Sequence, residues 1–445
     1  MNDWNDGLLR WLGPFLARFG HKARRRMCPL YVAGLIGPGD RKSVGPVAER
    51  VAPGAYDRLH HFVSDGVWDE APLERELAIQ ADKLVGGADA FLVIDDTALP
   101  KKGRHSVGVS PQYASALGKT ANCQTLVSMT LARGEVPVMV GLRLFLPESW
   151  TSDKARLERA GVPAEYRSAR AKSEIALAEL DRLIAADVRF ATVLADAGYG
   201  MGAEFRQALT ARGLAWAVGV PRHQKVYPRD VELVFPVAAR GRPRKRHLPT
   251  VLSVSAQDLL TQAKWRPLSW RKGTKGPLKA RFAAVRVRVA DGPPQRIGDK
   301  GMQHMPGDEV WLVGEQRPSG EQKYYLANLP PDADLETLAA TIKARWVCEQ
   351  AHQQLKEELG LDHFEGRSWR GLHRHALMTM IAYAFLQHLR LAAASGGKKN
   401  LARPASADDA GHTKSRRRRP GARSALPMPA LPPANRQGAR IILPE

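Results

Sequence analysis

The sequence has 445 residues, enough for two or three domains, and its hydrophobic and charged fractions of 44% and 25% are those of a folded protein rather than a disordered one. Its 67 Lys and Arg against 45 Asp and Glu give a net charge of +22, which favours a polyanionic partner, nucleic acid before a membrane surface. Its three cysteines are widely separated and form no CxxC pair, which excludes a disulfide or zinc framework.

The sequence gives no signal for export or membrane insertion. Residues 1–11 contain acids and Trp where a signal peptide has a cationic start and an apolar block, and no run reaches eighteen apolar residues. We therefore expect a cytoplasmic protein without a membrane partner. Residues 394–445 are rich in Gly, Ala, Pro and Arg, a composition that does not pack a core, so we expect a disordered basic tail there.

Residues 1–85 are expected to form a helical domain. Apolar side chains recur at helical spacing within the first nineteen residues, and a run of three Arg follows at 24–26. A small helical domain with Arg and Lys on its surface is a candidate for binding DNA through a helix.

The predicted elements of residues 86–220 alternate between strand and helix. Strands are predicted at 91–94, 123–131, 136–146, 190–195 and 214–220, and helices at 173–184 and 203–212. Gly134-Glu135 between the second and third strands indicates an antiparallel hairpin. Three strands, then helix, strand, helix and strand, is the order of an α/β fold of the ribonuclease-H-like type, with a mixed sheet and helices on both faces.

Two acids of this region follow predicted strands. Asp96 comes after an apolar run that is expected to stop at the acids, and Asp196 comes directly after the strand at 190–195. In this fold the two strands are parallel neighbours, and the sites of open α/β sheets collect beyond the carboxyl ends of strands. Two carboxylates there repel each other unless a cation lies between them. Taken singly, each Asp is more often a turn former or a helix cap.

Residues 221–328 are expected to interrupt the fold as a β-rich insertion domain, because further short strands are predicted within them. The insertion also places aromatic residues among cations, notably Trp265, Trp270, Arg271 and Lys272. Aromatic stacking together with phosphate pairing suits contact with nucleic acid. Exposed loop cations beside ordinary core Trp residues explain the same pattern equally well.

Residues 329–393 are expected to return to the catalytic core as helices. Within the long helix predicted at their centre, Arg345, Glu349, His352 and Lys356 recur at offsets of four, seven and eleven, so their side chains point the same way. Arg345 and Lys356 are suited to binding DNA phosphates. His352 joins them as a DNA-contact candidate, although a structural histidine is the commoner case. On an arbitrary helix such a stripe is a solvated face with ion pairs.

Asp96, Asp196 and Glu349 together predict a metal site. Carboxylate oxygens, with water in the remaining positions, are what Mg²⁺ or Mn²⁺ requires. Two such ions roughly 4 Å apart can activate a water or a 3′-hydroxyl and stabilise the leaving oxygen of a phosphodiester. We therefore expect these acids to hold two Mg²⁺ or Mn²⁺ ions.

Three motifs make the sequence resemble the DDE-type transposases of bacterial insertion sequences, in particular insertion-sequence family seven-zero-one, which is allied to family four. The motifs are Ile94-Asp-Asp-Thr-Ala-Leu-Pro-Lys-Lys-Gly103, Leu194-Ala-Asp-Ala-Gly-Tyr-Gly200, and Arg345-xxx-Glu349-x₆-Lys356 followed by Gly360-Leu-Asp-His-Phe-Glu-Gly-Arg-Ser368. Each motif alone is weak, but their order and separation are specific. The resemblance covers most of residues 30–392.

The resemblance implies that Asp96, Asp196 and Glu349 bind the catalytic metal ions, with Asp96 favoured over Asp95 because the family's catalytic Asp directly precedes Thr. It also implies the reaction. Such enzymes cut DNA at the terminal inverted repeats of the element and join the 3′-hydroxyl ends to target DNA, and a homodimer is expected to bridge the two ends.

Further positions follow from the same resemblance. Lys101 and Lys102 of the first motif are expected to contact DNA. Trp270 or Trp265 is a candidate for stacking on a flipped base, as a Trp of the insertion does in related transposases. Ile342 stands where family four has a Tyr, so the role of that Tyr is not carried over to this sequence.

Two other functions are compatible with the sequence. A structure-specific nuclease on the same fold would need no inverted repeats and would not join strands. A non-catalytic DNA-binding protein derived from a transposase would bind DNA without metal and leave it uncut, although the presence of all three acids argues against it.

Overall fold

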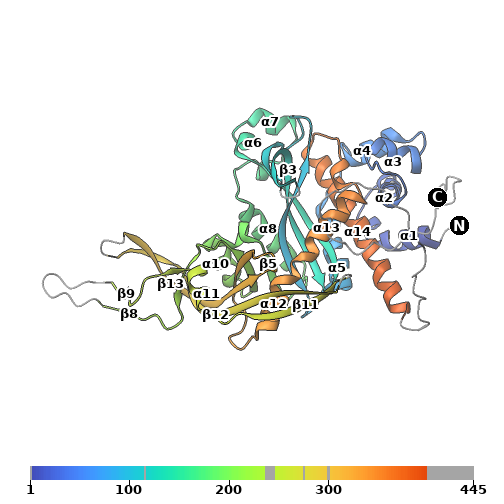
Figure 1. Cartoon of the computed structure of the whole chain (residues 1–445). Helices are drawn as coiled ribbons and strands as arrows, with labels where there is room; N and C mark the ends of the chain where they lie inside the picture. Colours follow the sequence, from blue (N-terminus) through green and yellow to red (C-terminus); the bar gives the residue numbers. More distant parts are fainter. Residues whose placement is uncertain (1–2, 115–116, 236–245, 274–275, 298–300, 398–445) are drawn as a thin grey trace, which may run out of the picture.

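The computed structural model describes residues 3–397 apart from 115–116, 236–245, 274–275 and 298–300. A mixed sheet of twelve strands runs through the described part, with helices packed against it and a β-rich extension on one side (Figure 1). Of the basic tail predicted at 394–445, only the first four residues are described, as the end of a helix. The remainder of that prediction lies outside the described residues.

The central strands confirm the predicted ribonuclease-H-like order. They are β1 (Phe91–Pro100), β3 (Lys119–Arg133), β4 (Val136–Phe145), β5 (Thr192–Ala195) and β6 (Ala215–Val220). They stand in the order β4-β3-β1-β5-β6, with β1, β5 and β6 parallel and β3 antiparallel to β1 and β4. The predicted hairpin is the β3–β4 turn, where Gly134 has a φ of 57° that favours glycine. A further strand, β2 (Ser110–Ala114), pairs with the first part of β3.

Strand β1 is longer than its prediction. The sequence predicts a strand that stops at Asp95, whereas β1 continues past both acids because β3 pairs with it along its whole length. Its parallel partner β5 is shorter, and their last pair is Ile94 with Ala195. Asp95 and Asp96 therefore lie just beyond the last residue of β1 that pairs with β5, at the level of Asp196.

Short helices connect β4 to β6. They are α6 (Glu148–Thr151), α7 (Lys154–Arg159), the 3-10 turn η2 (Ala164–Tyr166), α8 (Lys172–Ile184), α9 (Ala197–Gly200) and α10 (Ala203–Ala211). The helices predicted at 173–184 and 203–212 are α8 and α10.

Five helices precede the sheet and pack around the last helix of the described chain. They are α1 (Asp3–Leu16), α2 (Lys22–Ile36), α3 (Val44–Val51), α4 (Tyr56–Val63) and α5 (Ala71–Val85), and the last helix is α14 (Trp369–Gly397). Trp11 stacks on His388 of α14 with ring centroids 5.1 Å apart, and the guanidinium of Arg374 lies 4.2 Å from the ring centroid of Trp68. The N-terminal region is thus helical, as predicted, and shares one hydrophobic core with α14. The predicted domain boundaries stay predictions.

Helix α14 contains the one helical stretch, among the residues that the structure describes, with the length and composition to cross a membrane: Trp369–Ala394. Of its most apolar window, 67% is buried inside the protein, and the helix contacts α2, α5 and β4. Packing in the core therefore accounts for its apolar composition. The predicted cytoplasmic location stays a prediction.

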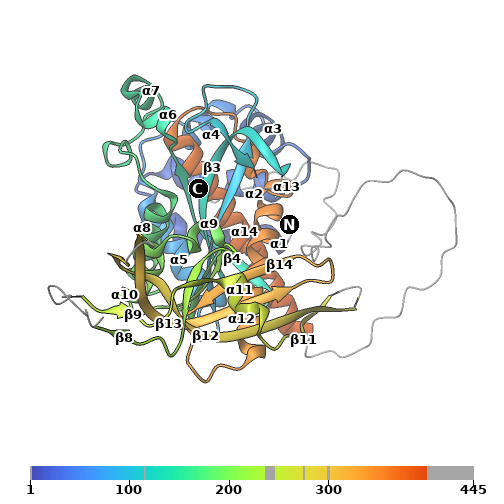
Figure 2. The same cartoon turned by 60° about the vertical axis from the view of Figure 1, so that its left-hand side comes forward.

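The insertion is β-rich, as predicted. Its elements are β7 (Lys225–Pro228), β8 (Leu233–Val234), β9 (Leu248–Pro249), β10 (Val254–Ser255), α11 (Ala256–Thr261), β11 (Arg266–Gly273), β12 (Gly276–Arg296), β13 (Met302–Gln316) and β14 (Gln322–Ala327). Because β14 pairs antiparallel with β6, the order β10-β7-β12-β13-β14-β6 continues the central sheet into the insertion. Figure 2 shows these strands on the side of the molecule away from α3 and α4.

The long helix predicted at the centre of residues 329–393, which carries Arg345 and Glu349, is interrupted. The elements found are α12 (Leu335–Ala344), α13 (Trp346–Glu357) and the 3-10 turn η4 (Leu361–His363). Arg345 lies between α12 and α13, and the N–H of Cys348 donates to its carbonyl at 3.2 Å, a bond across three residues where an α-helix spans four. After α13, Gly360 takes a φ of 68°, a left-handed conformation that favours glycine and commonly ends a helix.

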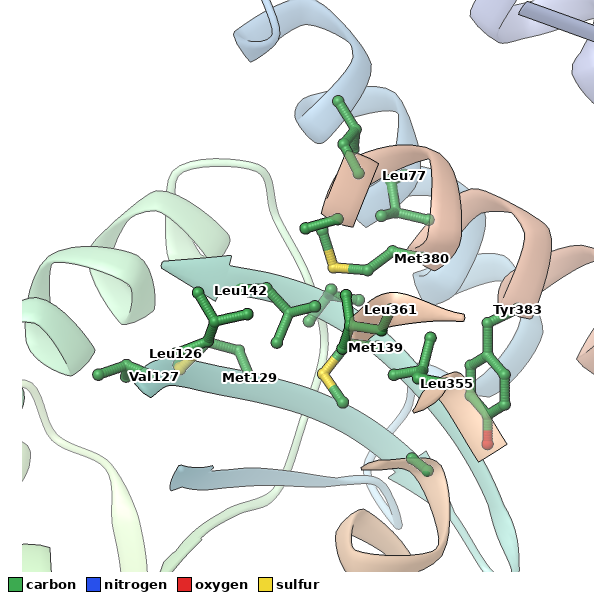
Figure 3. Close-up of a cluster of buried hydrophobic side chains, with 14 of the residues drawn as sticks. Leu77, Leu126, Val127, Met129, Met139, Leu142, Leu355, Leu361, Met380 and Tyr383 are labelled. Carbon is green, nitrogen blue, oxygen red and sulfur yellow. The ribbon is translucent and has the colours of Figure 1, made fainter. Parts of the chain in front are cut away.

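A buried cluster holds α13 against the sheet (Figure 3). Its side chains are each at most 2% exposed and come from α5, β3, β4, α13, η4 and α14: Leu77, Leu126, Met129, Met139, Leu142, Leu355, Leu361, Met380 and Tyr383. Tyr383 also donates a hydrogen bond to Gln354 of α13 at 2.9 Å. Burial of one such apolar side chain stabilises the fold by about 1.5–3 kcal/mol. The cluster therefore fixes the helix that carries Glu349.

Acid is expected to destabilise the protein through a buried histidine of α14. His375 lies 2.8 Å from the hydroxyl of Tyr31 and 2.9 Å from the carbonyl of Gly360, and burial lowers its pKa to about 4. Between about pH 6.5 and about pH 4 the unfolded chain therefore binds a proton that the folded chain does not. The free energy of unfolding should fall in this window by up to about 1.4 kcal/mol per pH unit for this group.

Urea unfolding across that window checks the expectation. The variant His375→Asn should flatten the pH dependence, and His61→Asn, at an exposed position of α4, is the matched control that should retain it. His352 and His373 are also buried with lowered pKa values, about 4 and about 3, so the wild-type dependence should be reduced in the His375 variant rather than abolished. Equal slopes in wild type and His375→Asn would contradict the assignment.

Candidate active site

Asp196 marks the carboxyl end of β5. Its side chain caps α9 by accepting hydrogen bonds from the N–H groups of Gly198, at 2.9 Å, and Tyr199, at 3.3 Å. Burial raises its pKa, and the neighbouring carboxylates of Asp95 and Asp96 raise it further. The predicted crowding of acids at this edge of the sheet is therefore present.

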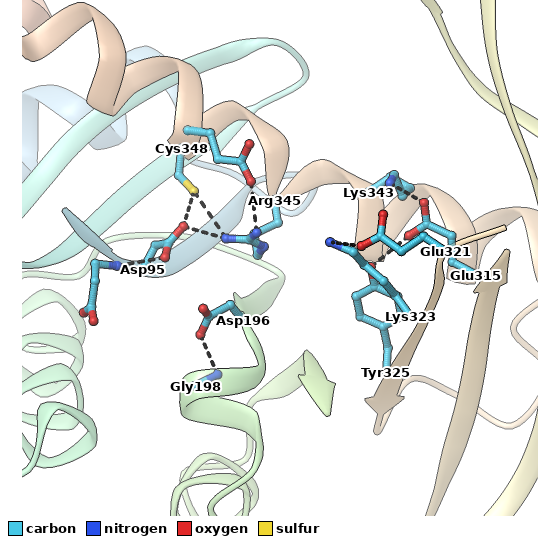
Figure 4. A network of polar contacts seen from close by, with 12 residues as sticks. Asp95, Asp196, Gly198, Glu315, Glu321, Lys323, Tyr325, Lys343, Arg345 and Cys348 are labelled. Atoms are coloured by element: carbon cyan, nitrogen blue, oxygen red, sulfur yellow. Dashed lines mark hydrogen bonds and ion pairs between the residues drawn. The ribbon is translucent and has the colours of Figure 1, made fainter. Parts of the chain in front are cut away.

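Asp95 and Asp96 point to opposite faces of β1, as neighbours in a strand must. Asp95 accepts from the guanidinium of Arg345 at 2.5 Å and from the thiol of Cys348 at 3.2 Å (Figure 4). Asp96 accepts from the hydroxyl of Tyr199 at 2.5 Å and forms an ion pair with Lys172 of α8. The helices α8 and α13 accordingly lie on opposite faces of the sheet.

Arg345 is the cation at the centre of the acids. Besides Asp95, its guanidinium binds Glu349 at 3.1 Å. Burial alone would lower its pKa, but the carboxylates of Asp95, Glu349 and Asp196 raise it overall. Burial would likewise raise the pKa of Asp95, and the charge of Arg345 lowers it overall. A positive charge thus already offsets the repulsion among the carboxylates.

The three predicted metal ligands are not gathered around one point. In the described residues, no group of three or more His, Cys, Asp or Glu side chains is arranged to hold a metal ion. The donors nevertheless suit Mg²⁺ or Mn²⁺, because all are carboxylates and because Asp196 already carries a raised pKa that a nearby divalent cation would lower. The side chains of Asp96 and Glu349 would have to reorient before they could bind metal ions together with Asp196. The triad stays a prediction.

Two residues beside the acids were not anticipated from the sequence. Lys172 pairs with Asp96, and its ammonium also lies 5.5 Å from the ring centroid of Phe145. Tyr199 is buried, and burial followed by the Asp96 charge raises its pKa well above the usual value. Tyr199 stands three residues after Asp196, one turn into the helix that Asp196 caps, so its position was available in the second motif. Nothing in the local sequence around Lys172 indicates its partner.

The lysines of the core that are predicted to contact DNA differ in how far they are exposed to solvent. Lys102 is exposed, whereas the ammonium of Lys101 donates to the carbonyls of Asp362 and Phe364 at 3.0 and 2.7 Å. Lys356 is half-buried, and burial lowers its pKa.

His352 requires a correction. Its ring is 8% exposed, its Nε2 lies 2.8 Å from the hydroxyl of Ser128 in β3, and burial lowers its pKa to about 4. An enclosed, neutral imidazole does not reach a DNA phosphate. The residue therefore packs α13 against the sheet, the commoner role for a histidine at such a position.

Three of the residues predicted to contact DNA from the insertion, Trp265, Trp270 and Arg271, contact other parts of the protein. Trp270 meets Phe282 edge to face with ring centroids 5.8 Å apart. The guanidinium of Arg271 lies 3.6 Å from the ring centroid of Trp346. Trp265 is half-buried, and its indole N–H donates to a backbone carbonyl at 3.2 Å. The core interpretation thus describes both Trp residues better than base stacking. The side chain of Lys272 lies outside the described part of the structure.

Comparison with known proteins gives three findings. Residues 14–277 match the family described as DDE superfamily endonuclease, a range that contains Asp96 and Asp196 and ends before Glu349. Over 203 residues the sequence is 31% identical to a probable transposase for insertion sequence element IS701 from Microchaete diplosiphon, an alignment that spans 44% of this chain and 50% of that protein. The cryo-EM structure of the piggyBac transposase synaptic complex with hairpin DNA aligns with a TM-score of 0.43 and 12% identity, covering 89% of this chain and 74% of that one.

Proposed function

Because this chain belongs to the DDE superfamily endonucleases, we propose that it is the transposase of a bacterial insertion sequence. It cuts DNA at the terminal inverted repeats of the element and joins the 3′-hydroxyl ends to target DNA. The observation that carries the proposal is the register of β1 and β5, which brings Asp95, Asp96 and Asp196 to one edge of the sheet. Arg345 connects that edge to the helix of Glu349 through its bonds to Asp95 and Glu349. The sequence similarity to a probable insertion-sequence transposase supports it.

In this proposal Asp96, Asp196 and Glu349 would hold two Mg²⁺ or Mn²⁺ ions. Such ions activate a water or a 3′-hydroxyl and stabilise the leaving oxygen of a phosphodiester. Tyr199 and Lys172 hold the Asp96 carboxylate in place by a hydrogen bond and an ion pair. The three acids thus act as ligands and take no part in proton transfer.

Cations around the acids are proposed to hold the DNA backbone. Arg345 has a planar guanidinium that matches the two oxygens of a phosphate, and Lys356 of α13 supplies a point charge two turns beyond Glu349. Lys102 is exposed, two residues beyond the end of β1. The net charge of +22 adds an attraction to DNA that does not depend on sequence. Since both ends of an element must be joined to one target, we propose that two copies of the chain act together.

Removal of the metal ion is expected to separate cleavage from binding. A supercoiled plasmid that carries the element's two ends should be nicked and then joined to target DNA in the presence of Mg²⁺. With EDTA in place of Mg²⁺ both products should disappear, whereas a gel shift with an end-containing duplex should remain, because phosphate contacts by Lys and Arg need no metal.

The same experiment separates the alternative functions. A structure-specific nuclease would cut DNA that lacks the element's ends and would give no joined product. A non-catalytic DNA-binding protein would shift the duplex and leave the plasmid intact with Mg²⁺ and with Mn²⁺. Cleavage that persists in EDTA would contradict the metal-dependent mechanism.

A further inference from the structure

The link between α12 and α13 is where the insertion meets the acids. We call residues 343–346 the junction. Arg345 of the junction binds Asp95 and Glu349, and Lys343 and Trp346 on either side of it are held by strands of the insertion. The position of the junction therefore depends on residues that lie far from it in the sequence.

Glu315 of β13 anchors the start of the junction. Its carboxylate is fully buried and accepts from Lys343 at 2.7 Å, from Arg317 at 3.1 Å and from the hydroxyl of Tyr325 at 2.9 Å (Figure 4). Burial would raise the pKa of Glu315, but the bond and charge of Lys343 lead the interactions that lower it overall. Because water does not reach this carboxylate, a shift of Lys343 would leave Glu315 with one cation fewer in a buried site.

Strand β11 holds the other side of the junction. The ammonium of Lys343 lies 4.5 Å from the ring centroid of Trp270, and the guanidinium of Arg271 lies 3.6 Å from the ring centroid of Trp346. Arg271 is in turn fixed by an ion pair of 2.5 Å with Glu135, in the turn that joins β3 and β4. Two cation–π contacts and two ion pairs thus connect the insertion, the junction and the central sheet.

We propose that the insertion positions the catalytic helix, with Glu315, Trp270 and Arg271 acting through the junction on Arg345 and Glu349. Trp270 and Arg271 are then positioning residues rather than DNA contacts. The inference rests on the proposed function, because it concerns the geometry of the same cleavage site.

Variants of the buried pair measure the effect of the junction on cleavage. Glu315→Gln and Lys343→Met should each lower the cleavage rate constant at saturating DNA and Mg²⁺ by up to about a hundredfold, the loss that a misplacement of about 1 Å can cause. The Kd for an end-containing duplex should rise only by a few-fold, through the single phosphate contact of Arg345, because Lys356, Lys102 and the net positive charge still attract the DNA backbone. Lys343→Arg keeps the charge and should recover most of the rate. The double variant Glu315→Gln with Lys343→Met removes both buried charges. If a single variant does not fold, the cleavage rate constant is measured on this double variant instead.

Arg271 distinguishes positioning from DNA binding. In Arg271→Met the rate constant should fall far more than Kd rises, whereas loss of a DNA contact would raise Kd and leave the rate constant at saturation unchanged. Arg271→Lys should behave like Arg271→Met if stacking on Trp346 matters, since the flat guanidinium is lost. Arg266→Met, at an exposed position of the same strand, is the matched control and should cleave at the wild-type rate.

The outcomes separate this inference from the proposed function. If the wild-type protein gives no metal-dependent cleavage, the proposed function fails. If the wild type cleaves and folded Glu315, Lys343 and Arg271 variants cleave at its rate, the positioning role is wrong. A raised Kd with an unchanged rate constant in Arg271→Met would overturn the inference and return Arg271 to DNA contact.

Discussion

Asp196→Asn is expected to lower metal-dependent DNA cleavage by about a thousandfold, equivalent to about 4 kcal/mol of transition-state stabilisation, because one ligand of the metal pair is lost. Asp96→Asn and Glu349→Gln should have losses of the same order. Removal of one acid from the crowded edge should leave folding intact, since burial and then the neighbouring carboxylate charges raise the pKa of Asp196 and thus disfavour its ionised form. Single-turnover cleavage of an end-containing duplex, with a gel shift on the same preparation, measures both quantities.

Asp95→Asn is the matched control for Asp96→Asn. The two positions are adjacent in β1 and differ in the face of the sheet that they occupy. We expect a smaller loss of cleavage at Asp95, whose carboxylate is bound to Arg345. If Asp95→Asn abolishes cleavage and Asp96→Asn does not, the metal ligand is Asp95, on the same face as Glu349. Undiminished cleavage in all of these variants would refute the active site.

Arg143→Met is expected to lower the free energy of unfolding by about 3–5 kcal/mol, the range for breaking a buried ion pair and leaving its partners uncompensated. Arg143 of β4 donates to Glu74 of α5 at 3.1 Å and to Glu179 of α8 at 2.9 Å, and the side chain is 12% exposed. Glu179 is also held by Arg182 at 3.0 Å. The variant would leave two carboxylates, whose side chains are 12% and 8% exposed, with one cation.

Urea unfolding at neutral pH measures this change. Arg143→Lys keeps the charge but reaches one partner at a time, so an intermediate loss is expected. Arg212→Met is a control of the same chemistry at the surface, since its partner Asp181 is half exposed, and it should change stability by at most about 1 kcal/mol. Equal losses in Arg143→Met and Arg212→Met would contradict the importance of burial.

The order of the central strands and the crowding of acids at one edge of the sheet could be predicted from the sequence. Apolar runs that end in acids identify strands, and the order of strands and helices then determines which strand ends are neighbours. The resemblance to DDE-type transposases, drawn from three short motifs, is confirmed by the family match over residues 14–277. These inferences work because each depends on local pattern and on chain order.

What could not be predicted depends on contacts between distant segments. Helical periodicity places Arg345, Glu349, His352 and Lys356 on one side, but it does not say that this side faces β3, where His352 becomes buried. The interruption at Arg345 likewise has no sequence signal such as Gly or Pro.

The aromatic and cationic residues of β11 show the same limit. Their composition suits stacking on bases as well as it suits packing. Arg271 packs on Trp346 and pairs with Glu135, and these partners come from opposite directions along the chain.

The packing of α1 to α5 around α14 has a consequence for synthesis of the protein. Leu8, Tyr31 and Leu77 belong to a core whose other wall, including Met378 and Tyr383, leaves the ribosome only after the whole sheet and insertion have been made. Until then the apolar sides of the first five helices remain uncovered and are open to association with other nascent chains. We therefore expect that α14 docks onto α1 to α5 slowly and late in folding. We also expect that the first five helices need chaperones early in translation.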